Sequence, residues 1–221
     1  MLTALLLIQA LAFQPTTTET GVERSWEEMP VHWRYDDSER PEYLSEDAVL
    51  EAVRASFESW NAVPNARVRF IEDDGGVPES EVNVVYWQPE WSWDEDVLAI
   101  TSTWAAESGE ILKFRIAINA KDPDWGTDGH RQSMDVQNAL THEVGHSLGL
   151  AHDPRHGEAT MAATAKRGEV RKRDLHSSDQ EGARYLYPGP NAGTSSCSSA
   201  PEPAFLALFA PLILAVRRRR T

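Results

Sequence analysis

Residues 142–153 read His142-Glu143-Val144-Gly145-His146-Ser147-Leu148-Gly149-Leu150-Ala151-His152-Asp153, or H-E-x-x-H-x-x-G-x-x-H-D. The first two histidines are four residues apart, so on a helix their rings stand on the same face, one turn apart. Two imidazole nitrogens in that arrangement can bind one Zn²⁺ ion, at about 2.0–2.1 Å each. The stretch therefore predicts a helix that carries part of a metal site.

The other positions of the motif complete this chemistry. Glu143 lies about 100° round the helix from His142, where its carboxylate can reach a water on the metal without binding the metal itself. Gly149 tolerates a positive φ, so the helix can end and the chain can turn back. We expect that turn to bring His152 to the same ion. The predicted metal ligands are His142, His146 and His152, and the predicted catalytic base is Glu143.

An apolar stripe supports the helix. Val136, Leu140, Val144 and Leu148 recur every four residues, as in a helix with one face against a core. Asp135 is the expected N-cap. Ordinary helix histidines are the alternative explanation, but the glutamate, the glycine and the third histidine all fall at the required offsets, which favours the metal site.

The extended motif resembles the metzincin clan of zinc peptidases. That clan also has a methionine in a tight turn after the third histidine. Met161, within Glu158-Ala159-Thr160-Met161-Ala162-Ala163, resembles this Met-turn; a plain core methionine is the alternative. Within the clan the chain is most similar to the matrixins, the matrix metallopeptidase family, and to their bacterial type. The resemblance covers residues 25–188.

This resemblance implies an α+β fold: a twisted, mostly parallel sheet with an antiparallel edge strand, an active-site helix and a C-terminal helix. Periodicity predicts elements in a compatible order: a helix over 45–60, strands over 67–72, 81–88, 97–106 and 111–119, and the active-site helix. The last two strands flank a turn at 107–110 and are expected to pair as a hairpin. The resemblance also implies a C-terminal helix over 179–187. By the same resemblance, substrate would lie antiparallel to the edge strand at 98–104. Residues 159–170 would wall the pocket for the residue after the cleaved bond.

Three features depart from the family pattern. Asp153 follows the third histidine where many matrixins have serine, and we expect it to brace the turn by hydrogen bonding. The ligand set of a second, structural zinc is not evident; His130, with Asp128 nearby, is a candidate, and a solvated loop histidine is the favoured explanation. The N-terminal region has no cysteine, so the latency based on a thiol in many matrixins is not expected.

Length and charge narrow the class of protein. A chain of 221 residues suits one domain with a proper core, which we expect to be a monomer. The net charge of −14 argues against a nucleic-acid partner. Acidic residues cluster at 72–74 and 94–96; they are either solvated loops or Ca²⁺ sites, since hard cations take oxygen ligands.

Residues 1–14 resemble a signal peptide. Residues 5–13 form an apolar run that contains Ala10-Leu11-Ala12, a small-residue cleavage site, although no Lys or Arg precedes Arg24. The protein is therefore expected to be exported, to the cell envelope, the cell surface or the medium.

The C-terminal residues 189–221 are expected to form a segment separate from the catalytic domain. Residues 189–203 are small and polar and predict a flexible linker. Residues 204–221 contain an apolar run and then arginines; a helix over that run would span about 20 Å, short of the roughly 30 Å of a bilayer core. With Cys197, this tail resembles the sorting tails of myxobacterial surface proteins. That resemblance implies processing or lipid attachment at Cys197 and at least transient membrane contact; a weak anchor with an incidental cysteine is the alternative.

These features together predict an exported zinc endopeptidase, in which metal-activated water hydrolyses peptide bonds of extracellular proteins or peptides. The alternative function is a non-catalytic zinc-binding protein of the cell surface. In both cases Zn²⁺ is the expected cofactor, and the tail is expected to lie outside the catalytic fold.

Overall fold

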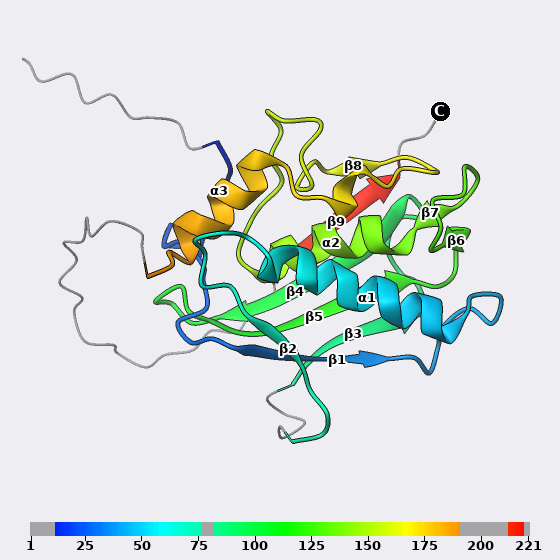
Figure 1. The fold of residues 1–221 in the computed structure, drawn as a ribbon, viewed down its shortest axis with the longest axis horizontal. Helices are drawn as coiled ribbons and strands as arrows, with labels where there is room; N and C mark the ends of the chain where they lie inside the picture. The colour runs from blue at the N-terminus through cyan, green and yellow to red at the C-terminus, as the bar shows by residue number, and fades with distance from the viewer. Residues whose placement is uncertain (1–11, 77–81, 191–211, 219–221) are drawn as a thin grey trace, which may run out of the picture.

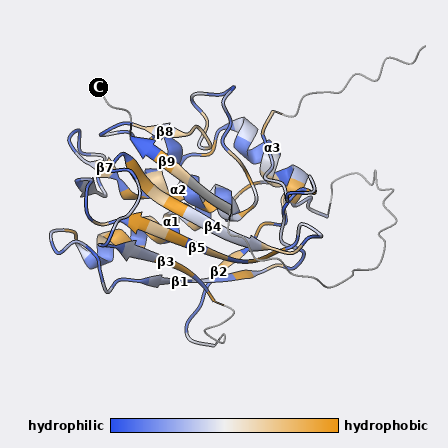
Figure 2. Ribbon diagram, turned by 180° about the vertical axis from the view of Figure 1, so that it is seen from behind, coloured by the Kyte–Doolittle hydropathy of each residue, from blue (hydrophilic) through white to orange (hydrophobic). Residues whose placement is uncertain are grey.

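The computed structural model describes residues 12–76, 82–190 and 212–218. Its main sheet has the strand order β2-β1-β3-β5-β4-β9-β8. The strands are β1 (Val31–Asp36), β2 (Phe70–Glu72), β3 (Asn83–Gln88), β4 (Val97–Ala105), β5 (Ile111–Asn119), β8 (Thr164–Ala165) and β9 (Leu212–Arg218). Helices α1 (Glu46–Asn61) and α2 (Val136–Ser147) lie side by side on one face of this sheet (Figure 1). Seen from the other side, the sheet lies in front of both helices (Figure 2).

The pairing of the strands confirms the predicted α+β fold. Strands β2, β1, β3 and β5 are parallel neighbours, whereas β4 runs antiparallel to β5. The predicted hairpin is present, and its register places Thr101 opposite Ile116. Strand β5 is rich in β-branched and aromatic residues. Phe114, Ile116 and Ile118, which share one face of the sheet, are buried, whereas Arg115 on the other face is exposed, as expected for a strand with one face against the core.

Aromatic packing fixes α1 on the sheet and α2 against α1. The rings of Trp33 and Phe57 stack with their centroids 4.0 Å apart, and Trp60 at the end of α1 is fully buried. The indole Nε1 of Trp60 donates to the Thr141 carbonyl of α2 at 2.9 Å. This bond joins the two helices one residue before the first histidine of the motif.

The ends of α2 are set by the residues that the sequence suggested. Asp135 is the N-cap and accepts a hydrogen bond from the Asn138 backbone N–H at 2.9 Å. Its other oxygen pairs with the guanidinium of Arg173 at 2.5 Å. The expected loop before α2 contains one short pairing, of β6 (Trp125–Gly126) with β7 (Met134–Asp135).

Helix α3 (Ser177–Leu186) anchors the segment around the methionine. It begins with a capping box in which Asp179 bonds back to the His176 backbone. The same carboxylate accepts from the backbone N–H groups of Thr160 and Met161, at 2.8 and 3.2 Å. A 3-10 turn at Arg171–Arg173 precedes α3. One buried carboxylate thus ties the end of the fold to the turn beneath α2.

The N-terminal segment packs onto the domain. Phe13 is buried against Tyr185, with ring centroids 5.2 Å apart, and the Gln14 carbonyl accepts from the Ala151 backbone N–H at 2.7 Å. Residues 1–11, which make up most of the expected signal peptide, lie outside the described residues, as do residues 191–211 with Cys197.

The C-terminal tail differs from the expectation that it lies outside the catalytic fold. Residues 212–218 form β9, a strand of the main sheet, and not part of a helix. A physical reason lies in β4, which without β9 would leave a row of backbone donors and acceptors unpaired. The sequence Leu-Ile-Leu-Ala-Val at 212–216 is rich in residues that suit a strand. Among the helices that the structure describes, none has the length and apolar character needed to cross a membrane.

Candidate functional site

Three histidines of the motif converge in the structure. Helix α2 places the Nε2 atoms of His142 and His146 3.0 Å apart, and the segment after the helix brings His152 beside them. One ligand nitrogen from each ring lies within 4.8 Å of the others. Within the described ranges, no other group of three or more histidine, cysteine or acidic residues comes together in this way.

Hydrogen bonds fix which nitrogen of each helix histidine faces the centre. Nδ1 of His142 donates to the Thr160 carbonyl at 2.6 Å, and Nδ1 of His146 donates to the Leu150 carbonyl at 2.7 Å. Each Nε2 then carries a lone pair, and two lone pairs cannot form a hydrogen bond with each other. Nε2 of His152 is buried without a hydrogen-bond partner. These three atoms fit a Zn²⁺ ion, whose histidine ligands are oriented in this manner.

Burial keeps the three rings neutral. It lowers the pKa of His142 well below the usual histidine range, with the nearby Lys172 charge as the second cause. Burial also lowers the pKa of His146, with the adjacent His152 next in importance, and lowers the pKa of His152 to about 4. Neutral imidazole is the form that binds a metal, so the site is prepared for an ion at neutral pH.

Gly149 produces the chain reversal that delivers His152. Its φ is +94°, and its backbone N–H donates to the His146 carbonyl at 3.0 Å. A Cβ at this position would overlap the carbonyl oxygen of Arg24. Both the positive φ and the close approach of the backbone at Arg24 therefore require glycine here.

Met161 and Asp153 lie where the Met-turn and its brace were expected. Met161 is buried beneath α2, and its side chain fills the space that Gly145 leaves by lacking a Cβ. The Asp153 backbone N–H donates to the Met161 carbonyl at 2.9 Å. Its carboxylate pairs with Arg155 at 3.1 Å and His156 at 2.6 Å. The two residues thus connect the third histidine to the turn.

Glu143 is buried beside the histidines, and both of its oxygens have partners. Oε2 accepts from the Thr101 hydroxyl at 2.6 Å, and Oε1 accepts from the Val216 backbone N–H at 3.0 Å. Burial raises the pKa of this carboxyl to about 7, against the opposing effect of these hydrogen bonds. A carboxyl with a pKa near the working pH can both take and return a proton.

Two residues of the site were missed by the sequence reasoning. Thr101 is the hydroxyl partner of Glu143, and only its place in the expected edge strand pointed toward it. Lys172 is fully buried; its Nζ donates to the Ala162 carbonyl and lies 3.4 Å from Nδ1 of His142. Burial lowers the pKa of Lys172 to about 8. Lys172 lies between two arginines in the sequence, a context typical of an exposed basic run.

The acidic clusters pair with arginines of the same chain. Ion pairs join Glu72 to Arg54 at 2.6 Å, Asp73 to Arg34 at 2.7 Å and Asp96 to Arg218 at 2.7 Å. The Ca²⁺ expectation therefore gains no support from these residues. His130, the weaker zinc candidate, is exposed and does not belong to the histidine group.

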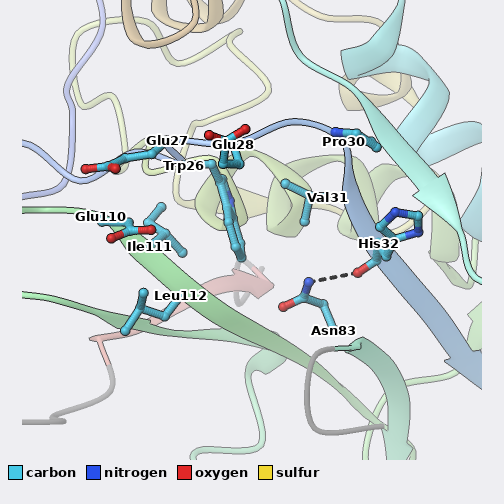
Figure 3. A pocket seen from close by; sticks show the side chains of 10 residues that line it. All are labelled: Trp26, Glu27, Glu28, Pro30, Val31, His32, Asn83, Glu110, Ile111 and Leu112. Carbon is cyan, nitrogen blue, oxygen red and sulfur yellow. Dashed lines mark hydrogen bonds between the residues drawn. The ribbon is translucent and has the colours of Figure 1, made fainter. Parts of the chain in front are cut away.

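A separate pocket lies at the start of β1 and β5 and includes none of the three histidines (Figure 3). Glu27, Glu28 and Glu110 contribute carboxylates to its lining. Burial, followed by repulsion from Glu27 and Glu28, raises the pKa of Glu110. The pocket is acidic, and it is distinct from the histidine site.

The fold and the histidine site are those of a metalloprotease domain. The family model described as Matrixin (Peptidase_M10) matches residues 25–188, and the chain belongs to the matrixin family. It is similar to metalloendoproteinase 2-MMP of Arabidopsis thaliana, with 36% identity over 88 residues that cover 37% of this chain and 22% of that protein. It is also similar to metalloendoproteinase 1-MMP of the same plant, with 22% identity over 175 residues, 75% of this chain and 45% of that protein. The matched regions thus cover less than half the length of either relative.

Gly149→Ala is expected to destabilise the domain by about 2–3 kcal/mol, because it adds backbone strain and a clash with Arg24. Zinc content after dialysis should fall as His152 is displaced. Gly157→Ala is the matched control, since a Cβ there meets nothing within 4 Å. Denaturant unfolding and metal analysis of both variants measure the effect, and equal stability of the two would contradict the role of Gly149.

The metal-free protein should lose stability as the pH falls. Folding lowers the pKa of His152 to about 4, so between that value and about 6.5 the unfolded chain binds more protons than the folded one. Between pH 6 and 5 we expect wild type to lose roughly 1 kcal/mol per pH unit more than His152→Gln. The control is His130→Gln, which removes an exposed histidine. Parallel pH profiles for wild type and His152→Gln would refute this expectation.

Proposed function

We propose that the protein is a zinc-dependent endopeptidase that cleaves proteins or peptides outside the cell. The observation that carries this proposal is the position of Glu143, a buried carboxyl with its pKa raised to about 7, beside three neutral imidazoles that share one centre. Membership of the matrixin family supports the same activity.

Different residues of the chain bind the metal, transfer the proton and position the catalytic carboxylate during peptide hydrolysis. Zinc, when bound by His142, His146 and His152, supplies a Lewis acid that polarises a carbonyl and acidifies water. Glu143 accepts the proton of the attacking water and returns it to the leaving amine. The Thr101 hydroxyl holds Oε2 of Glu143, while Oε1 accepts from the Val216 backbone N–H. Once β9 leaves its edge, strand β4 would offer its backbone to an extended peptide by strand addition.

Glu143→Gln should leave zinc binding intact and reduce hydrolysis of casein by at least about 100-fold, because the amide cannot carry the proton. Metal analysis and release of labelled fragments from casein measure the two properties. His142→Ala is the contrasting variant, since it should lose zinc as well as activity. Bound zinc without any chelator-sensitive hydrolysis, both in the wild type and in a variant whose strand β9 is released from β4, would instead favour the non-catalytic zinc-binding protein of the cell surface.

We also propose that the protein is exported and that its signal peptide is cut after Ala12. Packing of Phe13 and Gln14 onto α3 and the turn after α2 supports a mature domain that begins at Phe13. N-terminal sequencing of the protein from the envelope or medium of an exporting host should read Phe-Gln-Pro. A chain that still starts at Met1 there would contradict the cleavage. Sorting through Cys197, with transient membrane contact of the tail, belongs to the same proposal.

A further inference from the structure

Strand β9, formed by residues 212–218, lies between β4 and β8 in the main sheet (Figure 2). It runs antiparallel to β4, with Val216 opposite Ala99 and Leu214 opposite Thr101. Its other edge runs parallel to β8, with Arg217 opposite Thr164. These two neighbours belong to the strand and the wall segment that the family resemblance associates with substrate. The chain's own C-terminus thus occupies the place of an extended peptide, in the orientation expected for one.

The peptide bond between Ala215 and Val216 lies over the catalytic groups. The Val216 backbone N–H donates to Oε1 of Glu143 at 3.0 Å. On the other side of this bond, the Ala215 backbone makes a hydrogen bond with the His152 ring. The two residues that flank this peptide bond thus contact the predicted proton carrier and a predicted zinc ligand.

Contacts on either side fasten the strand. Val216 is fully buried and is part of the main hydrophobic core. The backbone N–H of Arg217 donates to the Ala163 carbonyl at 3.0 Å. Arg218 bonds Asp96 twice: its backbone N–H donates to the carbonyl oxygen at 2.8 Å, and its Nε donates to Oδ1 at 2.7 Å. The strand is therefore held by main-chain pairing, one buried aliphatic side chain and one ion pair.

With β9 in place, His142, Glu143 and His146 are closed off from solvent, and His152 is half-buried. The exposed fractions are 0% for His142, 0% for Glu143 and 1% for His146. An incoming peptide needs the same backbone groups of β4 and the same oxygen of Glu143. Since two strands cannot pair with one edge of β4, the C-terminal strand and a substrate exclude each other.

We propose that β9 is an intramolecular ligand of the substrate cleft, bound in the orientation of a substrate, and that it keeps the peptidase closed until it leaves. The description of the cleft as a substrate site rests on the proposed function; the docking of the strand does not. The contacts of β9 also define the peptides that replace it: an aliphatic residue in the buried position of Val216 and a basic residue two positions later, facing Asp96.

Two substitutions in the full chain test the docking. Val216→Asp places a charge in the core position and should release the strand, which raises hydrolysis of labelled casein by about tenfold or more. Arg218→Ala removes the ion pair with Asp96 and should raise hydrolysis about threefold. The matched controls are Val22→Asp and Arg131→Ala, which make the same changes at exposed positions and should hydrolyse casein at the wild-type rate.

Amide hydrogen exchange of the metal-free protein provides a readout that is independent of catalysis. The β4 amides that face β9 should be protected in wild type and should exchange at least about tenfold faster in Val216→Asp, whereas those that face β5 should stay protected in both. Peptides from α1 should keep their protection in both, which shows that the variant is folded. Protection of β4 should not depend on protein concentration, because the strand binds within its own chain.

The outcomes separate this inference from the proposed function. Unprotected β4 amides on the side that faces β9 in wild type, or protection that appears only at high protein concentration, would overturn intramolecular docking. Equal casein hydrolysis by wild type and Val216→Asp, with β4 released in the variant, would overturn the closure of an active enzyme by β9. If no variant hydrolyses casein while β4 is released by Val216→Asp, the docking stands and the peptidase assignment fails.

Discussion

The imidazole rings of His142, His146 and His152 must stay uncharged and direct one nitrogen each at a common centre. Several other features of the structure serve this requirement. Burial removes their charge, and carbonyls of Thr160 and Leu150 turn two of them toward the centre. The third arrives only because the chain reverses at Gly149. Charged rings at this separation would repel one another, so a dry interior is a condition of the site as well as a result of folding.

Burial shifts the pKa of a carboxyl group and of an ammonium group near the site in opposite directions. It raises the pKa of Glu143 to about 7 and lowers the pKa of Lys172 to about 8. Hydrogen bonds from Thr101 and Val216, and then the charge of Lys172, limit the rise in the pKa of Glu143, while the charges of Glu169 and Glu143 limit the fall in the pKa of Lys172. Asp179 adds rigidity from the other side by holding the backbone of Thr160 and Met161. Proton handling and metal binding thus depend on one compact region.

Local patterns predicted much of this structure. Helix α2 was predictable from the apolar stripe of Val136, Leu140, Val144 and Leu148 and from the cap at Asp135. The predicted matrixin resemblance is confirmed by the family model that matches residues 25–188. The partners of the site could not be predicted, because they come from distant segments. Thr101 meets Glu143 only through the pairing of β4, and the burial of Lys172 depends on how the 3-10 turn packs. The sequence alone predicts that the apolar tail is a separate segment, because an apolar stretch of this kind suits a bilayer and the edge of a sheet equally well.

The position of β9 links two events that the sequence alone keeps apart. A segment paired with β4 cannot at the same moment insert into a lipid layer, become modified along its length or be held by a sorting machine. If β9 is the intramolecular ligand proposed above, thermodynamic linkage makes the relation reciprocal: whatever captures the C-terminal strand would uncover the three histidines, and a peptide paired with β4 would set the strand free. By this coupling, attachment of the C-terminal segment at a surface and the onset of proteolysis would both follow from one equilibrium, the release of β9 from β4.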